Sequence, residues 1–201
     1  MSNTFDLNGI RTPRQKRAKA SGDTATKPLA ICPFTILVDT REQLPYDFSG
    51  MATNDGELLA VPKRIIGLPS GDYSIEGMQS SVAVERKSLD DLYGSVTWGR
   101  QRFEHEIVRL NAMSEDFHSG FAAVVIEADW REIMAPAEHR PGWVNRTEPR
   151  SVEGTIAAWS VRYPRVHWWA CGDRRGAELR TFAILRAFWN EQQKGSYCAK
   201  R

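Results

Sequence analysis

Residues 81–91 read SVAVERKSLDD, an apolar run that ends in three charged residues and leads into a helix start. The alternation of Val82 and Val84 with smaller residues predicts a β-strand. Ser88 can accept a hydrogen bond from the third residue of a following helix, which is Asp91. The stretch therefore predicts a strand whose charged end lies at the edge of a sheet, followed at once by a helix.

Similar patterns predict further strands and helices on both sides of this stretch. Before it, strands are expected at residues 35–38, 62–68 and 72–75, with a turn at 69–71, a loop at 43–60 and a short helix at Glu57–Ala60. After it, helices are expected at 100–113, 151–163 and 178–192, and strands at 120–128 and 165–170. Late strands separated by helices require a sheet that is covered on both faces. We therefore predict an α/β fold with three α/β/α layers over residues 34–193.

The charge of the chain is unevenly distributed. The whole sequence has 27 Lys and Arg against 25 Asp and Glu, a net charge of +2. Residues 1–28 hold six basic and two acidic residues and few large apolar ones, whereas residues 29–201 carry a net charge of −2. We predict a disordered basic tail over residues 1–33, either a solvated leader or an arm that attracts phosphate, and a short C-terminal tail over residues 194–201.

Several protein classes are excluded because their sequence patterns are absent. The apolar runs are far shorter than the roughly 20 residues of a membrane-spanning helix, and the N-terminal segment has no apolar signal-peptide core. The three cysteines are widely spaced and the four histidines form no metal-binding pattern, so neither a disulfide scaffold nor a zinc site is expected. No glycine-rich nucleotide-binding motif is present.

Three acids and a lysine stand at the ends of predicted strands. Asp39, Asp72, Glu85 and Lys87 would converge at one edge of the sheet, and converging carboxylates repel one another unless a cation lies between them. Oxygen ligands suit Mg²⁺ or Mn²⁺, and Lys87 points to the same sheet face as Glu85. The arrangement suits phosphodiester hydrolysis, although ordinary solvated charges would give a similar local pattern.

Two further features suit either an ordinary structural role or nucleic-acid binding. Arg102, Glu106 and Arg109 share one face of the predicted helix at 100–113, which suits solvent or a polyanion. Trp98 and Trp143 adjoin glycines in predicted loops, where they are either packing residues or platforms for base stacking.

The charged residues also form a series of motifs in a fixed order. The chain contains Gly71-Asp72, then Glu85-Arg86-Lys87 and, after three more residues, Asp91. Val38-Asp39-Thr40-Arg41-Glu42 precedes them and Gly94-Ser95 with Gly99-Arg100 follows them. In this order the sequence resembles the XPF-type nuclease domains, which include the catalytic subunits of structure-specific flap endonucleases, over about residues 34–193. The resemblance implies a restriction-endonuclease-like core with a mixed central sheet and Mg²⁺- or Mn²⁺-dependent cleavage of DNA.

The resemblance also implies roles for individual residues. Asp72 and Glu85 would be the principal metal ligands, and Asp39 would complete the acidic cluster directly or through water. Lys87 would hold the attacking water, and Arg86 would contact phosphate or tie the cluster together. The remaining expected site residues are Glu42 and Asp91 as outer ligands or their supports, and Arg41, Arg100 and Arg102 as DNA contacts. For Arg100 and Arg102, pairing with Glu104 and Glu106 within the helix is the alternative.

The sequence also departs from the eukaryotic members of the family, because no tandem helix-hairpin-helix module follows the nuclease domain. The grip on duplex DNA would then come from the basic tail, from a second protomer or from another protein. We expect a cytoplasmic bacterial or phage-like endonuclease that acts on branched or 3′-flap DNA in repair, recombination or replication. A homodimer through residues 151–163 or 178–192 is a further expectation. The alternatives are a non-catalytic DNA-binding module with a nuclease fold, and a nuclease without structural preference.

Overall fold

The computed structural model describes residues 29–113, 120–135 and 147–198, with the side chains of 195–198 left out. Eight strands and five helices are assigned within these ranges. The first 28 residues of the predicted tail and Trp143 lie outside the described residues. Residues 29–33 of that tail are described, and they include the strand β1 Ala30–Ile31 and the buried Cys32. No helix in the described ranges is long and apolar enough to cross a membrane.

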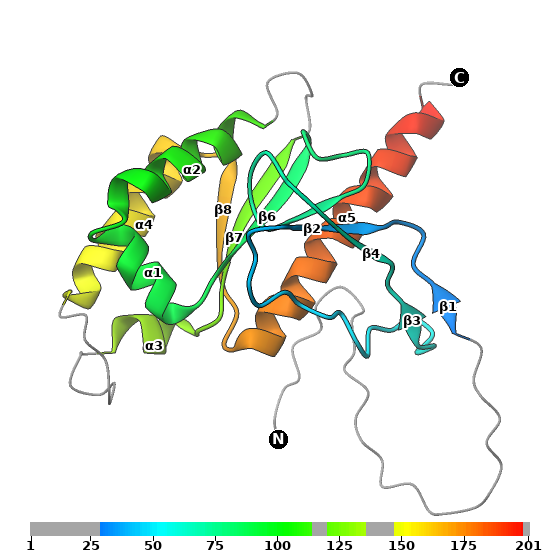
Figure 1. Ribbon diagram of the computed structural model, residues 1–201, viewed down its shortest axis with the longest axis horizontal. Helices are drawn as coiled ribbons and strands as arrows, with labels where there is room; N and C mark the ends of the chain where they lie inside the picture. The colour runs from blue at the N-terminus through cyan, green and yellow to red at the C-terminus, as the bar shows by residue number, and fades with distance from the viewer. Residues whose placement is uncertain (1–28, 114–119, 136–146, 199–201) are drawn as a thin grey trace, which may run out of the picture.

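Six strands form one mixed sheet in the order β4-β2-β5-β6-β7-β8 (Figure 1). The strands β2 and β4 are parallel, as are β6, β7 and β8, whereas β5 is antiparallel to both of its neighbours. Their bounds are β2 Ile36–Asp39, β4 Lys63–Ile66, β5 Tyr73–Ile75, β6 Val82–Lys87, β7 Phe121–Ile126 and β8 Val166–Ala170. The predicted mixed sheet is therefore confirmed.

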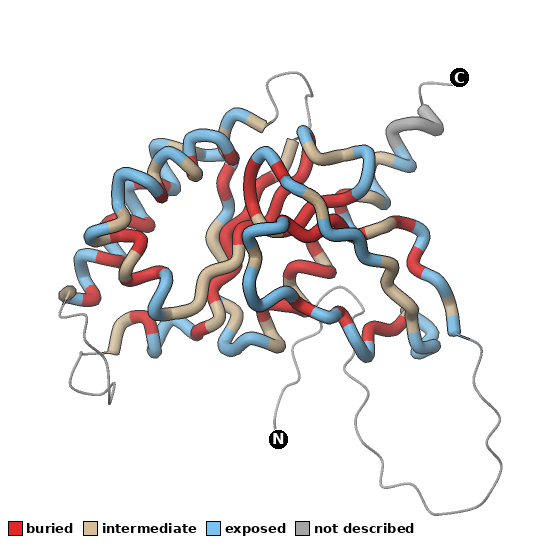
Figure 2. Tube along the Cα trace, viewed as in Figure 1, coloured by how far each residue is buried: buried red, intermediate tan, exposed pale blue. Residues whose placement is uncertain are grey.

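Helices cover both faces of this sheet, as Figure 1 shows. The helices are α1 Leu89–Val96, α2 Arg100–Ala112, α3 Trp130–Met134, α4 Pro149–Arg162 and α5 Arg174–Cys198. Apolar side chains of α1, α2 and α4 pack with Ala83 and Val124 on one face, and those of α5 pack with Val84 and Val125 on the other. The central strands are buried between these layers (Figure 2). The three-layer α/β/α prediction is confirmed.

The prediction for residues 57–60 is wrong. A short strand, β3 Leu59–Ala60, replaces the expected helix and pairs in parallel with β1 Ala30–Ile31. The Ala30 N–H donates to the Leu58 carbonyl at 3.0 Å, and Ala52 and Leu58 form an antiparallel bridge. A single helical turn gains too few hydrogen bonds to form on its own, so pairing with a distant segment decides the structure of this loop.

Helix α3 was not predicted, and α5 begins earlier and ends later than expected. Asp129 and Glu132 form a reciprocal cap around α3, with bonds of 2.8 and 2.7 Å between the backbone of one and the side chain of the other. At the start of α5, the Gly176 N–H donates to Asp173 Oδ1 at 2.6 Å. Both helices therefore begin beside an aspartate that satisfies free N–H groups in the first turn.

Candidate active site

A cleft of about 700 Å³ lies between the edge of the sheet and helices α1 and α2. It is formed by the segment after β2, the turn before β5, the end of β6 and one side of each helix. The predicted site residues that line it are Arg41, Glu42, Asp72, Glu85, Arg86, Lys87, Asp91 and Arg102. Of the other predicted site residues, Asp39 and Arg100 do not line this cleft.

The turn at Gly71 brings Asp72 alongside β6. Gly71 has a φ of +72°, and an added Cβ would lie 3.1 Å from Ala83 Cβ and 3.2 Å from the Val84 carbonyl oxygen, so the turn requires glycine. The Asp72 N–H then donates to Val84 O at 2.9 Å, and the Arg86 N–H donates to Asp72 Oδ2 at 2.7 Å. The carboxylate of Asp72 is thus held against the charged end of β6.

Burial disfavours the ionised forms of the Asp72 and Glu85 carboxyls. Burial and the charge of Glu85 raise the pKa of Asp72 to about 8. Burial also raises the pKa of Glu85 above its usual range, although the charge of Lys87 opposes this rise. Two buried carboxyls with raised pKa values in one cleft mark a candidate functional site.

Lys87 lies on the same side of β6 as Glu85, because side chains two residues apart in a strand point to the same face of the sheet. Lys87 Nζ is 2.7 Å from Glu85 Oε1 and 4.5 Å from the centre of the Phe103 ring. Burial lowers the pKa of Lys87, but the charge and hydrogen bond of Glu85 outweigh it, so the net pKa lies above the ordinary value. Lys87 is therefore a charged ammonium at neutral pH.

Of the carboxylates that line the cleft, those of Asp72 and Glu85 are the predicted ligands of a divalent cation; Glu42, Asp91 and Glu106 line it as well. Within the described residues, no group of three or more His, Cys, Asp or Glu side chains is arranged to hold a metal. The donor chemistry nevertheless fits a hard cation such as Mg²⁺ or Mn²⁺, since a positive ion would offset the burial and the neighbouring negative charges that raise the pKa of both carboxyls.

Asp39 does not line the cleft, and its carboxylate accepts hydrogen bonds from two neighbouring residues. Its carboxylate accepts the N–H and Nε of Arg41 at 2.7 Å each, a second Arg41 guanidinium N–H at 3.0 Å, and the Leu68 N–H at 2.6 Å. Burial alone would raise the pKa of Asp39, but these hydrogen bonds hold it below the usual range. Asp39 is 1% exposed and joins the end of β2 to the turn that precedes Gly71.

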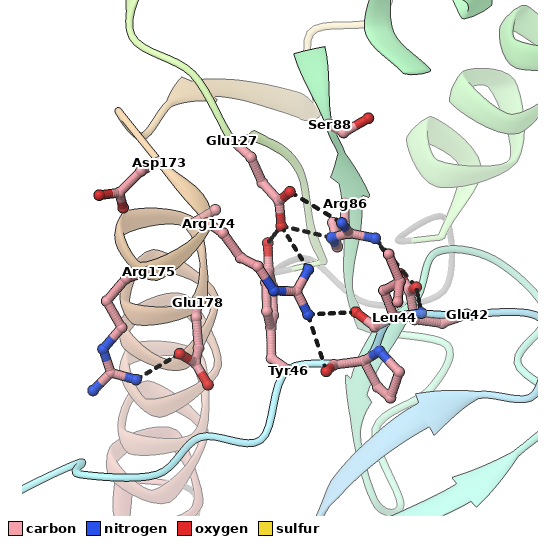
Figure 3. A network of polar contacts seen from close by, with 12 residues as sticks. Glu42, Leu44, Tyr46, Arg86, Ser88, Glu127, Asp173, Arg174, Arg175 and Glu178 are labelled. Atoms are coloured by element: carbon pink, nitrogen blue, oxygen red, sulfur yellow. Dashed lines mark hydrogen bonds and ion pairs between the residues drawn. The ribbon is translucent and has the colours of Figure 1, made fainter. Parts of the chain in front are cut away.

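Arg86 belongs to a second network, on the side of the sheet that α5 covers (Figure 3). Its guanidinium donates to both oxygens of Glu127 at 2.7 and 3.0 Å and to Glu42 at 3.2 Å. Glu127 also accepts the Tyr46 hydroxyl and Arg174, each at 3.0 Å. Glu127 directly follows the last residue of β7, and an acid at the end of a buried strand is the signal that could have identified it.

The charged face of α2 lines the cleft. Arg102, Glu106 and Arg109 all contribute to its wall, and Arg102 forms no ion pair among the described residues. Glu106 pairs with Arg109 and accepts the Ser70 hydroxyl at 2.9 Å and the Gly71 N–H at 3.0 Å. Burial would raise the pKa of Glu106, but these hydrogen bonds lower it. The sequence predicted this charged face without predicting the contact to Gly71.

Arg100 and Trp98 occupy different surroundings near the start of α2. Arg100 donates to Thr155 Oγ1 at 2.7 Å and lies over the ring of Trp159, so it ties α2 to α4 rather than pairing with Glu104. Trp98 is 82% exposed, and its indole lies against Gly94, where an added Cβ would be 3.2 Å from Nε1. Trp98 is thus an exposed aromatic ring beside the cleft helices, not a core residue.

Comparisons with known proteins agree with this geometry. The profile of the ERCC4 domain matches residues 38–177. XPF from Aeropyrum pernix in complex with DNA is similar in fold, with 22% identity and a TM-score of 0.50 over 81% of this chain and 66% of that one. A second structure of XPF from Aeropyrum pernix has 20% identity and a TM-score of 0.49 over 81% and 69% of the two chains.

The chain spans slightly less than two thirds of the length of the DNA-bound XPF that it resembles. No curated protein sequence matches significantly. The likeness in fold establishes a restriction-endonuclease-like core, and the profile match extends over more than half of the sequence. The chain therefore belongs to the ERCC4 domain family, the family of DNA nucleases that includes XPF.

Proposed function

We propose that the chain is a Mg²⁺- or Mn²⁺-dependent endonuclease that hydrolyses phosphodiester bonds in branched or 3′-flap DNA. One observation carries the proposal: Asp72, Glu85 and Lys87 meet in one cleft with Arg102, a cation that forms no ion pair within the part of the chain that the structure describes. The buried carboxyls favour a cation, and the arginine favours the phosphate backbone beside it.

In this proposal Asp72 and Glu85 hold the cation. A cation bound by them would supply positive charge to the phosphate and would lower the pKa of water. The Arg86 N–H fixes Asp72 from one side, while the Gly71 turn fixes its backbone. The position of the Asp72 carboxylate is therefore set before the substrate arrives, and that of Glu85 is restrained by its ion pair with Lys87.

Lys87 positions the attacking water instead of removing its proton. Its pKa lies above the ordinary lysine value, so a neutral amine would be scarce at neutral pH. Its ammonium sits 2.7 Å from Glu85 and can donate further hydrogen bonds toward the cleft. Lys87→Met is expected to lower the rate of cleavage without abolishing cation binding.

We assign outer roles to the other predicted acids. Asp91 exchanges hydrogen bonds with Ser88 at the start of α1, and Glu42 pairs with Arg86, so each supports a cleft residue. The four hydrogen bonds to Asp39 favour a positioning role over direct ligation of the cation. Its metal role stays a prediction, which the Asp39 variant discussed below tests.

The DNA path follows the charged face of α2. Arg102 and Arg109 line the cleft and would contact phosphates. Arg41 also lines it, and its side chain stays 65% exposed although its guanidinium binds Asp39, so it could contact phosphate as well. Arg100 is excluded from this proposal, because its guanidinium is committed to Thr155 and Trp159. Replacing Arg102 by Ala should weaken DNA binding about equally for every sequence and reduce its salt dependence.

Homodimer formation remains a prediction. The apolar residues of the two expected dimer segments, such as Ile156, Trp159, Phe182 and Leu185, pack on the sheet. Val161, which is 83% exposed, is the large apolar residue that α4 leaves at the surface. Sedimentation velocity at micromolar concentration, with and without DNA, would measure the oligomeric state, and a monomer under both conditions would contradict the dimer.

A substrate panel tests the proposed activity. Linear, forked, 3′-flapped and four-way DNA would be incubated with Mg²⁺, with Mn²⁺ or with EDTA. We expect nicking of the flapped and forked substrates with either ion, none with EDTA, and loss of nicking in Asp72→Ala and Glu85→Ala. Salt-sensitive binding without cleavage of any substrate would instead support the DNA-binding module, and equal cleavage of all four would support a nuclease without structural preference.

A further inference from the structure

The carboxylate of Glu127 is shared by three side chains from separate parts of the fold (Figure 3). Arg86 donates to both of its oxygens, and Arg174 and the Tyr46 hydroxyl donate to Oε1. The Glu127 side chain is only 10% exposed, and that of Arg86 is 9% exposed. A buried ion pair of this kind is costly to break from one side, because the remaining charge is left without its partner.

Both the backbone and the side chain of Arg86 are held by hydrogen bonds. Its backbone N–H donates to Asp72 Oδ2 at 2.7 Å, and its guanidinium is bound by Glu127 and Glu42. Strand alternation directs the Arg86 side chain to the α5 side, whereas Glu85 and Lys87 point toward α1 and α2. The Arg86 guanidinium is therefore bound to Glu127 and Glu42 on the other face of β6 from the Glu85 carboxylate, although Arg86 also contributes to the cleft lining.

We propose that Glu127 is a positioning residue for the cation site, because it holds the Arg86 guanidinium on the α5 side of β6 and so leaves Asp72 and Glu85 free to bind a divalent cation. This inference rests on the proposed function, and it adds a residue that the sequence motifs do not contain. Glu127 acts through Arg86 and does not itself contact the cation.

The charges around the network explain why Glu127 is needed. Two guanidiniums, of Arg86 and Arg174, face two carboxylates, of Glu42 and Glu127, so the group is electrically balanced. Without the charge of Glu127, the buried Arg86 would retain Glu42 alone as a carboxylate partner. The backbone of Arg86 already contacts a further carboxylate, that of Asp72. A guanidinium that paired with Asp72 would compete with the cation for the same oxygens.

The network also fixes the loop after Glu42. Arg174 donates to the carbonyl oxygens of Leu44 and Pro45 at 2.6 and 3.1 Å, and its guanidinium lies 4.9 Å from the centre of the Tyr46 ring. Glu127 therefore anchors α5, this loop and β6 at one point. The position of Glu42, the other partner of Arg86, depends on the same anchor.

Calorimetric titration of DNA-free protein with MnCl₂ tests the inference. We expect Glu127→Gln to weaken Mn²⁺ binding by about 10- to 100-fold, the usual loss when a partner of a ligand-holding group is changed. The matched control is Glu104→Gln, which also removes a carboxylate bound to an arginine and a tyrosine, at Arg162 and Tyr163, outside the cleft. The control should bind Mn²⁺ as wild type does, and equal affinity in wild type and Glu127→Gln would overturn the inference.

A double variant separates this role from a general loss of structure. Arg86→Met with Glu127→Gln removes both buried charges but keeps the N–H that donates to Asp72. If Glu127 acts by restraining Arg86, the double variant binds Mn²⁺ more tightly than Glu127→Gln, and thermal melting confirms that it is folded. Binding as weak as in Glu127→Gln would overturn the inference. Wild-type protein that binds no Mn²⁺ would instead overturn the proposed function, and the inference with it.

Discussion

Glu106 Oε1 accepts the N–H of Gly71 at 3.0 Å, so helix α2 holds the residue that precedes Asp72. The same oxygen accepts the Ser70 hydroxyl at 2.9 Å. Gly71 and Glu106 are 35 residues apart in the sequence, and their contact helps to set the position of Asp72, a proposed metal ligand. The cleft is organised from the helix side as well as from the sheet.

The first prediction concerns Glu106. Glu106→Ala leaves the Gly71 N–H and the Ser70 hydroxyl without their acceptor, and we expect kcat/KM on flapped DNA to fall about 10- to 100-fold through misplacement of Asp72. Glu106→Gln keeps a carbonyl oxygen and should retain most of the activity. Single-turnover cleavage assays measure both, with Glu104→Ala on the same helix as the control. Wild-type rates in Glu106→Ala would contradict the positioning role.

The second prediction concerns the stability of the Gly71 turn. Gly71→Ala combines a φ of +72° with contacts of 3.1 and 3.2 Å to β6, so we expect the free energy of unfolding to fall by about 1–3 kcal/mol. Gly154→Ala is the matched control, because Gly154 lies inside α4 and, apart from its chain neighbours and its own helix backbone, no described atom is within 4 Å of an added Cβ. That change should raise stability by about 0.5–1 kcal/mol. Urea denaturation measures both, and two shifts of the same sign would refute the argument.

The sequence predicted the local features of the site well. The strand and helix start within residues 81–91 form as expected, with the Asp91 N–H bound to Ser88 Oγ at 3.1 Å. The placement of Lys87 beside Glu85 also follows from strand periodicity alone. These features depend on spacing along a single element, which a sequence displays directly.

The features that sequence reasoning missed depend on contacts between distant segments. The short strand at Leu59–Ala60 exists through pairing with β1, and Glu127 has a role through Arg86, 41 residues away. Arg100 looked equivalent to Arg102 in the sequence, but α4 binds one guanidinium and leaves the other in the cleft. Partners of this kind are chosen by tertiary packing, and periodicity does not encode them.

The third prediction uses the raised pKa of Asp72. The pKa of Asp72 is about 8 in the folded protein, whereas in the unfolded chain the carboxyl releases its proton near the ordinary aspartate pKa of 3.8. Between pH 4 and pH 8 the folded protein therefore retains a proton that the unfolded chain has lost. Stability therefore falls as the pH rises through this window, and the full penalty applies above about pH 8. In EDTA at pH 8, Asp72→Asn should melt several degrees above wild type, whereas at pH 4 the two should coincide.

Differential scanning fluorimetry in EDTA measures this difference. The exposed Glu153→Gln on α4 is the control and should leave the melting temperature unchanged at both pH values. Mn²⁺ should narrow the gap at pH 8, because only the wild type would gain stability from binding the ion. A variant that melts below wild type at pH 8 in EDTA would show that the charge of Asp72 stabilises the fold.

The fourth prediction is that Asp39 changes folding stability with pH in the opposite direction to Asp72. Its pKa lies below the usual range, so its carboxylate stabilises the fold above about pH 3.8, and this contribution is lost as the pH falls through the folded-state pKa. Asp39→Asn should lower the free energy of unfolding by about 1–3 kcal/mol at pH 7, with a smaller difference at pH 3. Urea denaturation at the two pH values measures it. A stabilised Asp39→Asn in EDTA would favour direct metal ligation instead.

The last prediction concerns Trp98, whose ring lies on Gly94 with 82% of the residue exposed. Ser95 before it and Arg102 after it both line the cleft, so an unpaired base at a DNA branch could stack on this ring. Trp98→Ala should weaken binding of forked DNA in EDTA by about 5- to 150-fold, since stacking contributes about 1–3 kcal/mol per base, and it should barely change binding of blunt duplex. Fluorescence anisotropy measures both, with Val161→Ala, which removes an equally exposed apolar side chain from α4, as the control. Equal losses on forked and blunt DNA would show that Trp98 reads the duplex surface rather than an unpaired base.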